Sequence, residues 1–597
     1  MPHPSARRVA SCALAAITVT AGSLLGAPAA GAQPVEPFRL TILHNNDGES
    51  QLRGAPGQPD FGGIARFVAL TQALQAQAKE TGSGLLTVSS GDNFLAGPEF
   101  QASLDNGAPF YDSLALNRVG YDALAIGNHE FDFGPDTLAD FISGFDSDTP
   151  FLSANLDVSA EPALDDLGDR IAPSTVVETE GERVGIVGAT TPALASISSP
   201  RDVVVDPDVA GVVQAEVDAL TADGVDKIVL ISHLQSVLED RELVAQLRDV
   251  DVAIAGGGDE LLAGPDDALV PDDVPSVDPA SGLPFGYPIS VHDSTGREIP
   301  VVTTAGNYKY VGRLAVEFDD ASNVTVVDPG SGPVRVSGVA PDAVAPDADV
   351  LAETVEPVDA FVAELEQTVV AQSEVGLDGT RASVRTIESN LGNLVADALL
   401  DAGTDGAAEF GVTPPQVALQ NGGGMRNDAV IPAGPVTELD TFDIAPFPNF
   451  VAVVPDVPRA QFKELLENAV SNVEGVDGRF AQVAGFRFTW DALGAAQVVT
   501  DDGTVTTPGA RVTDVVLDDG TVLVAGGVVV DGPGISVATQ DFSARGGDQY
   551  PFRGLPFASV GASYQQALSD FITDDLAGAI AAADYPEGGE GRITRVN

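Results

Sequence analysis

The sequence predicts an α/β protein in which a parallel or mixed β-sheet is covered by helices. From Phe38 to about Val327, short apolar runs of strand length alternate with stretches of helical periodicity. Residues 60–78 are one such stretch, with apolar residues recurring on one face after a Gly62-Gly63 entry. Five of the apolar runs end in residues that bind metal ions or move protons. Because open α/β sheets bind ligands beyond the carboxyl ends of their strands, these endings predict one convergent site.

The five polar endings follow one another in chain order, and each comes directly after a predicted strand. They are His44-Asn45-Asn46-Asp47 after Leu40 to Leu43, Ser89-Ser90-Gly91-Asp92 after Leu85 to Val88, Gly127-Asn128-His129-Glu130-Phe131-Asp132 after Leu124 to Ile126, Ser232-His233 after Ile228 to Ile231, and Gly256-Gly257-Gly258-Asp259-Glu260 after Val252 to Ile254.

The N-terminal 32 residues are typical of a secretory signal peptide. Arg7 and Arg8 give a positive start, residues 9–26 are uncharged and largely apolar, and Ala30-Gly31-Ala32 fits a small-residue cleavage site. We therefore expect cleavage near Ala32 and secretion, into solution or to a loosely held cell-wall position. The alternative is an uncleaved N-terminal membrane anchor. The single cysteine, Cys12, lies inside this segment, so the mature protein would contain no disulfide.

The formal net charge of −59 limits the kinds of partner that the protein can bind. A surface this acidic repels nucleic-acid polymers and anionic lipids, so a phosphate-bearing substrate must be attracted by local cations. We expect bound metals and a few arginines to reverse the sign inside the binding cleft. No stretch beyond the signal segment is long and apolar enough to span a bilayer.

The remaining chain predicts two large domains, at 38–337 and 371–597, joined by a linker and spacer helix at 338–370. Residues 261–298, rich in Pro, Asp and Gly, are expected to form a long surface insertion in the first domain. In the second domain we expect a helix capped by Asn390 and β-hairpins between residues 498 and 539. The second domain is therefore expected to be mixed α and β. The spacer helix is predicted from the helical spacing of Val358, Phe361, Val362, Leu365 and Val369.

Metal-binding and proton-moving groups occur together in the endings of the first domain. A carboxylate can bridge two divalent ions, and two such ions can hold a hydroxide and clamp a phosphoryl group for in-line attack. His129, with Asp132 to orient its imidazole, suits a group that stabilises a transition state or protonates a leaving oxygen. The side chains suited to divalent cations are Asp47, Asp92, Asn128 and His233.

These motifs resemble those of the secreted 5'-nucleotidases, a two-domain branch of the calcineurin-like metallophosphoesterases that also includes UDP-sugar hydrolases and 2',3'-cyclic nucleotide phosphodiesterases. The resemblance covers nearly all of the mature chain. It implies an N-terminal sandwich of mixed sheets covered by helices and a C-terminal mixed α+β substrate-binding domain. It also implies a dinuclear metal centre bridged by Asp92, and His129 with Asp132 as the catalytic pair. The ligands that it implies are Asp47, Asp92, Asn128 and His233.

The chain departs from the family pattern in two places. Where relatives usually have Asp-x-His, it has Asp47-Gly48-Glu49, and where they have Gly-Gly-His-x-His or -Gln, it has residues 256–260, Gly-Gly-Gly-Asp-Glu. With Glu49 and Glu260 as ligands, the first ion's position becomes richer in carboxylate, which favours manganese, magnesium or calcium over zinc. The second ion loses a ligand at Gly258, a place left for Asp259 or water.

Motifs of the second domain point to nucleotide recognition. The glycine run at 421–426 lets the backbone approach a ligand closely and ends in an arginine suited to anions. Two phenylalanines in later motifs can sandwich a nucleobase, and Asp548 can accept hydrogen bonds from a ribose. The substrate-binding residues that the resemblance implies are Arg385, Asn421, Arg426, Phe447, Asn449, Phe542 and Asp548.

The leading hypothesis is a secreted phosphohydrolase with two divalent metal ions that releases phosphate from nucleoside 5'-monophosphates by attack of a metal-held hydroxide. Two alternatives on the same site are UDP-sugar hydrolysis and 2',3'-cyclic nucleotide phosphodiesterase activity. An alternative of another class is a non-catalytic extracellular nucleotide-binding protein whose metal site has degenerated at Glu49 and Gly258.

Overall fold

The N-terminal half is built on two mixed β-sheets that share one apolar core. The computed structural model describes residues 37–597 except 56, 448 and 501–502, so the expected signal peptide at 1–32 lies outside the described residues. The first sheet contains β15 (Val324–Val327), β14 (Tyr310–Phe318), β1 (Phe38–Asn45), β2 (Gly84–Ser89), β3 (Ala123–Ala125), β4 (Phe151–Leu152) and β6 (Ile171–Ala172) in that order, with β16 (Gly332–Arg335) beside β14. The second contains β12 (Ile289–His292), β13 (Glu298–Val302), β11 (Val252–Ile254), β10 (Ile228–His233), β8 (Glu182–Thr190) and β7 (Ser174–Thr179).

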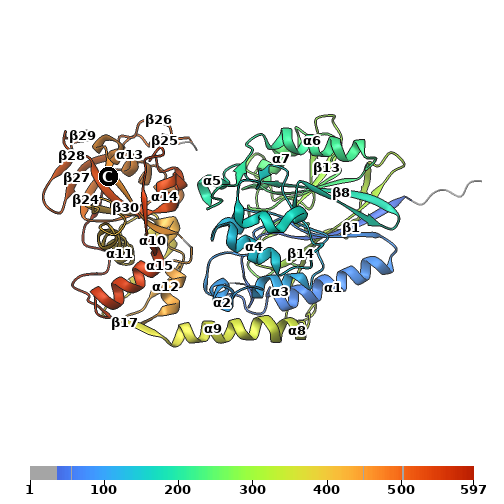
Figure 1. Cartoon of the computed structure of the whole chain (residues 1–597), viewed down its shortest axis with the longest axis horizontal. Helices are drawn as coiled ribbons and strands as arrows, with labels where there is room; N and C mark the ends of the chain where they lie inside the picture. The colour runs from blue at the N-terminus through green and yellow to red at the C-terminus, as the bar shows by residue number, and fades with distance from the viewer. Residues whose placement is uncertain (1–36, 56, 448, 501–502) are drawn as a thin grey trace, which may run out of the picture. The chain divides into compact units, whose positions relative to one another are not determined.

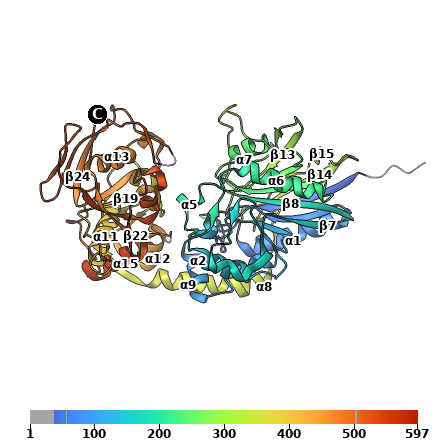
Figure 2. The same ribbon diagram turned by 45° about the horizontal axis from the view of Figure 1, so that its top comes forward.

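The central strands are buried on both faces, which explains why they read as continuous apolar runs. In β1, Leu40 and Ile42 belong to the core between the sheets, whereas Leu43 packs in the core under the first set of helices. Helices cover the outer faces of both sheets (Figures 1 and 2). The first face carries α1 (Ile64–Glu80), α2 (Pro98–Asn106), α3 (Tyr111–Asn117) and α4 (Pro135–Ser143), and the second carries α6 (Val209–Ala222) and α7 (Val237–Val244).

Parallel pairing brings the polar strand endings to common edges. Asn45 of β1 pairs with Ser89 of β2, and Ser89 pairs with Leu124 of β3, so the loops after these strands emerge side by side. The parallel strands β10 and β11 place their endings together in the same way in the second sheet. The five endings are therefore divided between two packed sheets, and the sandwich is the fold class that the resemblance implies.

Two local expectations need correction. The region 261–298 is only partly a surface insertion, because β12 pairs antiparallel with β13 at the edge of the second sheet and Leu262 is buried. The spacer helix is α9 (Glu356–Gln367), preceded by α8 (Ala348–Val350) and a wider turn at Leu351–Val355, and it ends before Val369. Val369 begins β17 instead of continuing the helical face.

The C-terminal half is mixed α and β, as expected. Within the described residues, its sheets share no strand with those of the N-terminal half. The predicted boundaries near 337 and 371 stay a prediction. One sheet contains β23 (Ala481–Ala484), β19 (Val417–Asn421), β30 (Ile535–Gln540), β22 (Phe450–Val457) and β31 (Ala558–Ser563), another β29 (Val528–Val529), β28 (Val522–Ala525), β27 (Val512–Leu517), β24 (Phe486–Asp491) and β33 (Ile593–Val596), and a third β21 (Gly434–Thr437), β17 (Val369–Ser373) and β32 (Ala579–Ile580).

The longest helix of this half, α11 (Asn390–Gly406), is capped by Ser389, not by the expected Asn390. The Ser389 side chain accepts a hydrogen bond from the Gly392 N–H, while the side-chain amide oxygen Oδ1 of Asn390 accepts from the Asp378 N–H. Of the hairpins expected between residues 498 and 539, one is formed by β27 and β28, with the Asp-Asp-Gly sequence 518–520 in its turn. A second Asp-Asp-Gly sequence begins with Asp501 and Asp502, which lie outside the described residues. The other helices are α10 (Arg381–Val384), α12 (Glu438–Ile444), α13 (Arg459–Ala469), α14 (Asp541–Arg545) and α15 (Tyr564–Asp570).

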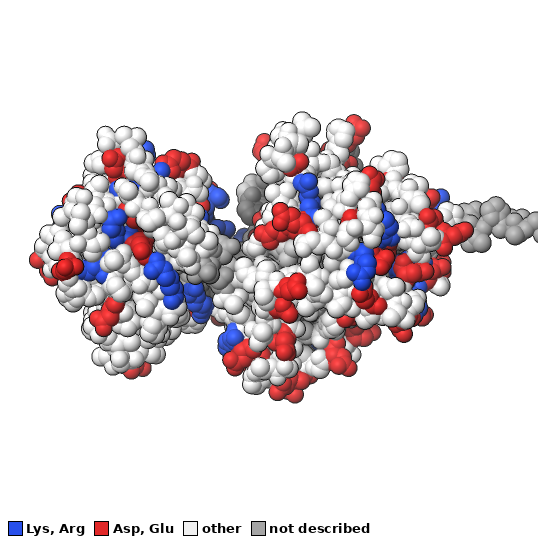
Figure 3. Space-filling view, turned by 90° about the horizontal axis from the view of Figure 1, so that it is seen from above, with Lys and Arg blue, Asp and Glu red and all other residues white. Residues whose placement is uncertain are grey.

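Acidic side chains dominate the surface. In Figure 3, Asp and Glu are spread over the visible face, and Lys and Arg occur in scattered patches, as the net charge of −59 requires. Among the described residues, no helix combines the length and the apolar character needed to cross a bilayer.

Candidate active site

Three side chains from three strand endings meet in a buried cluster with the donor set of a metal site. One ligand atom from each of Asp47, Asp92 and His233 lies within 4.8 Å of the others, and all three residues are buried. Asp47 and Asp92 have left-handed backbone conformations, with φ of 48° and 52°, in the turns that follow β1 and β2. The structure thus brings together Asp47, Asp92 and His233, as the sequence predicts.

The cluster fits a divalent cation. Nδ1 of His233 donates to the Ser90 carbonyl oxygen at 2.7 Å, which leaves Nε2 to face the cluster, 2.9 Å from Oδ2 of Asp92. Apart from this ion-pair contact, the buried Nε2 has no hydrogen-bond partner among the described residues. Burial and the Asp92 charge raise the pKa of Asp47 to about 7, although His233 opposes the shift. A cation would relieve the repulsion between the Asp47 and Asp92 carboxylates and would accept Nε2 of His233 as a ligand.

A buried glutamate holds two of the ligand-bearing loops together. The Glu130 carboxylate accepts hydrogen bonds from the backbone N–H groups of Asp92 at 2.9 Å, Asn93 at 2.8 Å and Gly127 at 2.7 Å. Gly127 is required here because a Cβ at this position would lie 2.2 Å from Oδ1 of Asp92. Sequence reasoning gave Glu130 no role. Its place in the motif after β3 was the available signal.

The two motifs that depart from the family pattern place their acidic side chains differently, so that Glu49 lies near Asp47 and Glu260 does not. Burial, followed by the charge of Asp259, raises the pKa of Glu49 to about 8, so these two carboxylates share one electrostatic environment with Asp47. Glu260 instead turns toward the start of α7, where it accepts from the Ser236 hydroxyl at 3.0 Å and the Val237 N–H at 3.3 Å. These contacts favour Asp259 over the expected Glu260 beside the metal cluster.

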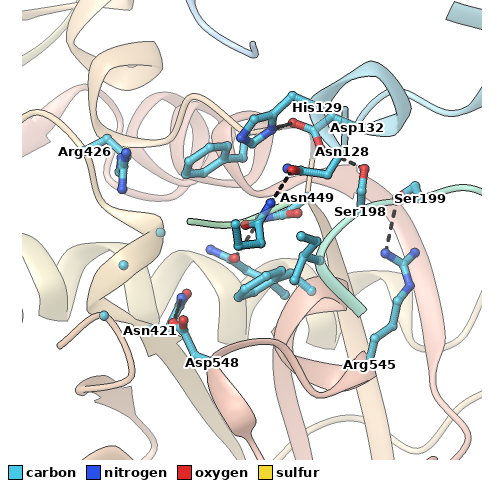
Figure 4. Close-up of a pocket in the computed structure, with 18 of the residues that line it drawn as sticks. Asn128, His129, Asp132, Ser198, Ser199, Asn421, Arg426, Asn449, Arg545 and Asp548 are labelled. Atoms are coloured by element: carbon cyan, nitrogen blue, oxygen red, sulfur yellow. Dashed lines mark hydrogen bonds and ion pairs between the residues drawn. The ribbon is translucent and has the colours of Figure 1, made fainter. Parts of the chain in front are cut away.

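The two residues predicted as the catalytic pair, His129 and Asp132, are in contact. Nδ1 of His129 lies 2.6 Å from Oδ2 of Asp132 (Figure 4). Nε2 of His129 lies 3.8 Å from Oδ2 of Asp92. Burial lowers the pKa of His129, but the carboxylates of Asp132 and Asp92 outweigh it and hold the pKa well above its usual value. The hydroxyl of Ser198, which sequence reasoning missed, donates to Oδ1 of Asp132 at 2.9 Å. The imidazolium is thus oriented from one side and faces the metal cluster with the other.

Asn128 is buried and its amide oxygen is not free. Nε2 of Gln235 donates to Oδ1 of Asn128 at 2.8 Å. Gln235 follows β10 by two residues and was not singled out from the sequence. Its signal, an amide just beyond the motif that ends in His233, is too common in loops to be specific.

The expected substrate residues of the C-terminal half are arranged in pairs. Nδ2 of Asn421 donates to Oδ2 of Asp548 at 2.6 Å, and Nδ2 of Asn449 donates to Oε1 of Gln540 at 2.9 Å. The guanidinium of Arg426 lies 5.3 Å from the ring centroid of Phe447. The ring of Phe542 packs where a side chain at position 547 would project.

Arg385 lies in the same region with an unpaired donor. It is 8% exposed, and its Nε makes no hydrogen bond with the described residues. Burial and the neighbouring charges of Arg381 and Arg426 lower its pKa. A buried guanidinium with a free donor beside a second arginine is suited to an anion.

One cavity is lined both by these groups and by His129 and Asp132. It has a volume of about 350 Å³ and lies within the compact unit Phe38–Asn597. Drug-sized ligand sites have volumes of about 300 Å³ upward, so a nucleoside monophosphate is within its capacity. The predicted residues that line it are Asn128, His129, Asp132, Arg385, Asn421, Arg426, Phe447, Asn449, Phe542 and Asp548.

Comparison with known proteins decides the family. Residues 369–553 match the model of the 5'-nucleotidase C-terminal domain. The structure also superposes on a 5'-nucleotidase precursor from Thermus thermophilus with a TM-score of 0.68 and 32% identity, over 94% of this chain and 100% of that one. The chain belongs to the 5'-nucleotidase family. As a member of this family it is a metal-dependent phosphoric ester hydrolase, with the fold that the resemblance implies.

Curated relatives of the 5'-nucleotidase family agree. The chain is 29% identical to the 5'-nucleotidase of Diplobatis ommata in an alignment of 461 residues that covers 76% of this chain and 74% of that protein. It is 30% identical to the trifunctional nucleotide phosphoesterase protein YfkN of Bacillus subtilis (strain 168) in an alignment of 489 residues that covers 76% of this chain but only 29% of that protein.

Proposed function

We propose that the protein releases phosphate from nucleoside 5'-monophosphates. The observation that carries this proposal is the single cavity shared by the catalytic pair His129–Asp132 and by the paired polar groups Asn421–Asp548. A phosphate placed beside His129 leaves the sugar and base to extend toward the C-terminal residues. This arrangement selects for an ester that carries both a phosphate and a nucleoside.

Each group of residues has a separate task. Asp548 accepts hydrogen bonds from the ribose hydroxyls, and Asn421 holds its carboxylate in place. Phe447 and Phe542 supply apolar ring faces for the base. Arg385 and Arg426 attract the phosphate into an otherwise acidic protein. His129, oriented by Asp132, stabilises the developing negative charge and gives a proton to the leaving 5'-oxygen.

Divalent cations would be held by Asp47, Asp92, Asn128 and His233, with Glu49 and Asp259 beside them. When bound, they activate water and neutralise the phosphoryl oxygens. The excess of carboxylate over imidazole supports manganese, magnesium or calcium over zinc.

A UDP-sugar or a 2',3'-cyclic nucleotide is the second candidate substrate class. A further cavity of about 770 Å³ lies against Glu49 and shares Arg426 and Phe447 with the first. It offers room for a group beyond the scissile phosphate. The printed name of the Bacillus subtilis relative, a trifunctional nucleotide phosphoesterase, supports keeping this class in view.

Secretion remains part of the proposal. It rests on the signal-like pattern of residues 1–32, and relatives described as snake venom 5'-nucleotidases support an extracellular setting.

A substrate and metal panel tests the proposed activity. Purified mature protein would be assayed with each of manganese, magnesium, calcium and zinc on 5'-, 3'- and cyclic nucleotides, a UDP-sugar and p-nitrophenyl phosphate. We expect the highest kcat/KM for a nucleoside 5'-monophosphate. Inactivity with every metal, or a preference for the phosphate ester without a nucleoside, would contradict it.

A further inference from the structure

The second ion's missing ligand has no room to be supplied from position 258. A Cβ at Gly258 would lie 2.1 Å from Oε2 of Glu260, so the Glu260 carboxylate occupies the space into which a side chain there would project. Glu260 is itself held by the start of α7. Asp259 does not fill the gap, because its Oδ1 accepts from the Gly306 N–H at 3.2 Å, beside Asp47.

Gln235 brings an uncharged amide group to Asn128, which is one of the predicted metal ligands. It comes two residues after His233, and its amide nitrogen reaches to 2.8 Å from Oδ1 of Asn128. Its other amide contact is a long one, 3.4 Å to the Leu234 carbonyl oxygen. Gln235 also lines the cavity that contains Asn128 and His129. Its side chain is solvent-exposed, so the amide is free to turn.

The contact between the two amides has the spacing of two neighbouring metal ligands. Oxygen ligands at about 2.1 Å from an octahedral ion lie about 3 Å apart when they occupy adjacent positions. A glutamine amide exchanges its oxygen and nitrogen by a half-turn about one bond. In the structure the Gln235 N–H faces the Asn128 oxygen, an orientation that avoids the repulsion of two facing oxygens. With a cation between them, both oxygens gain by facing it.

We propose that Gln235 is a ligand of the second metal ion, through its amide oxygen, and replaces the side chain that Gly258 lacks. This inference rests on the metal centre of the proposed function. A neutral amide oxygen completes the coordination without adding another negative charge to a cluster that already contains several carboxylates. It is also a hard donor, so it selects manganese or magnesium over zinc at this position.

Metal titration of the apo-protein tests the inference without reference to activity. Manganese binding would be followed by calorimetry and by electron paramagnetic resonance for the wild type and Gln235→Leu, which keeps the side chain's size but has no oxygen. We expect two bound ions in the wild type. In the variant, one ion should bind with unchanged affinity, and the affinity for the other should fall by about 10-fold or more. Gln235→Glu, which keeps an oxygen at this position, should restore the affinity for the second ion.

Two controls separate the possible outcomes. Gln246→Leu changes an exposed glutamine just beyond α7, whose amide reaches only the Glu242 carbonyl oxygen, and should leave both affinities unchanged. Asn128→Ala should lower the affinity for the second ion whether or not Gln235 is also one of its ligands. If Gln235→Leu binds both ions with wild-type affinity, the inference is overturned. If Asn128→Ala then still loses the second ion, the metal centre is present and the proposed function stays intact. Anomalous scattering from manganese-soaked crystals should show Oε1 of Gln235 at ligand distance, and its absence there would also overturn the inference.

Discussion

Ser198 donates a hydrogen bond from its hydroxyl to Oδ1 of Asp132 at 2.9 Å, while the other carboxylate oxygen of Asp132 contacts Nδ1 of His129 at 2.6 Å. The hydroxyl therefore fixes the rotation of the carboxylate that orients the imidazole. The adjacent Ser199 accepts from Nη1 of Arg545 in α14 at 3.2 Å, so the same short segment also contacts the C-terminal half (Figure 4).

Ser198→Ala should lower kcat about 10-fold with little change in KM. A hydrogen bond to a charged group contributes about 1.5–3 kcal/mol, and 1.4 kcal/mol corresponds to a factor of ten in rate. Ser198→Thr, which keeps the hydroxyl, should recover most of the rate. Ser143→Ala, at an exposed hydroxyl that bonds only to the Asp140 carbonyl oxygen, is the matched control. An equal rise in KM, or no rescue by threonine, would argue for a merely structural role.

His129→Ala should reduce kcat by about 100-fold or more, because proton transfer and charge stabilisation at the leaving oxygen are lost together. The affinity for a nucleoside monophosphate and the metal content should stay close to those of the wild type. Steady-state kinetics, equilibrium dialysis and metal analysis check the three parts. A variant that has also lost its metal would leave the rate effect without this explanation.

Removal of metal should abolish activity and lower the thermal midpoint. Ligands that bind the folded state stabilise it by mass action, and at 100 times the dissociation constant the effect is about 2.7 kcal/mol. The buried carboxylates of Asp47 and Asp92 add mutual repulsion once no cation separates them. Differential scanning fluorimetry of chelated protein, followed by addition of manganese, checks this. An unchanged midpoint in the chelated protein would show that these side chains do not hold a cation.

Phe542→Ala should raise KM for nucleoside monophosphates about 10- to 100-fold, since stacking on one aromatic ring contributes about 1–3 kcal/mol per base. KM for p-nitrophenyl phosphate should change little by comparison. Phe410→Ala, at a ring that is 43% exposed and outside the cavity lining, serves as the control. Equal losses on both substrates would place Phe542 in the core packing of the domain instead of at the base.

Asp112→Asn should stabilise the protein at pH 8 but not at pH 3.5. Asp112 is fully buried, Oδ2 accepts from the Ser103 hydroxyl at 2.7 Å, and burial raises its pKa from 3.8 to about 6. The folded state therefore binds the proton more tightly than the unfolded chain, and the wild type loses stability as pH rises from about 4 to 6.

Asp112→Asn has no carboxyl group at this position, so it does not lose stability as the pH rises. We expect it to exceed the wild type by about 1–3 kcal/mol at pH 8, with the difference vanishing below pH 4. Urea unfolding at both pH values measures it. A difference that is the same at pH 8 and pH 3.5 would assign the effect to packing instead of ionisation.

Sequence reasoning located this buried carboxylate and histidine cluster because strand endings can be recognised from apolar runs, and parallel pairing brings those endings together. Asp47, Asp92 and His233 were found in this way. Ser198 and Gln235 were not found, because they reach Asp132 and Asn128 across 66 and 107 residues of chain and lie in loops without a pattern.

Local ambiguities explain the other differences. Ser389 and Asn390 are both good caps, and only the observed hydrogen bond to Gly392 decides between them. Asp259 and Glu260 are adjacent acids, and the left-handed backbone of Asp259, with φ of 55°, decides which one turns toward Asp47. Neither choice is visible in residue spacing.

The hydrogen bonds that Glu130 accepts from the loops after β2 and β3 affect how the proposed metal centre is assembled. Because one carboxylate accepts from the backbone at both Asp92 and Gly127, hydrogen bonds within the protein hold the backbone of Asp92 at a fixed distance from the loop that contains Asn128. Metal binding then needs little reorganisation of this part of the site. The choice between metal ions then depends on ligand positions that the protein holds in place by itself.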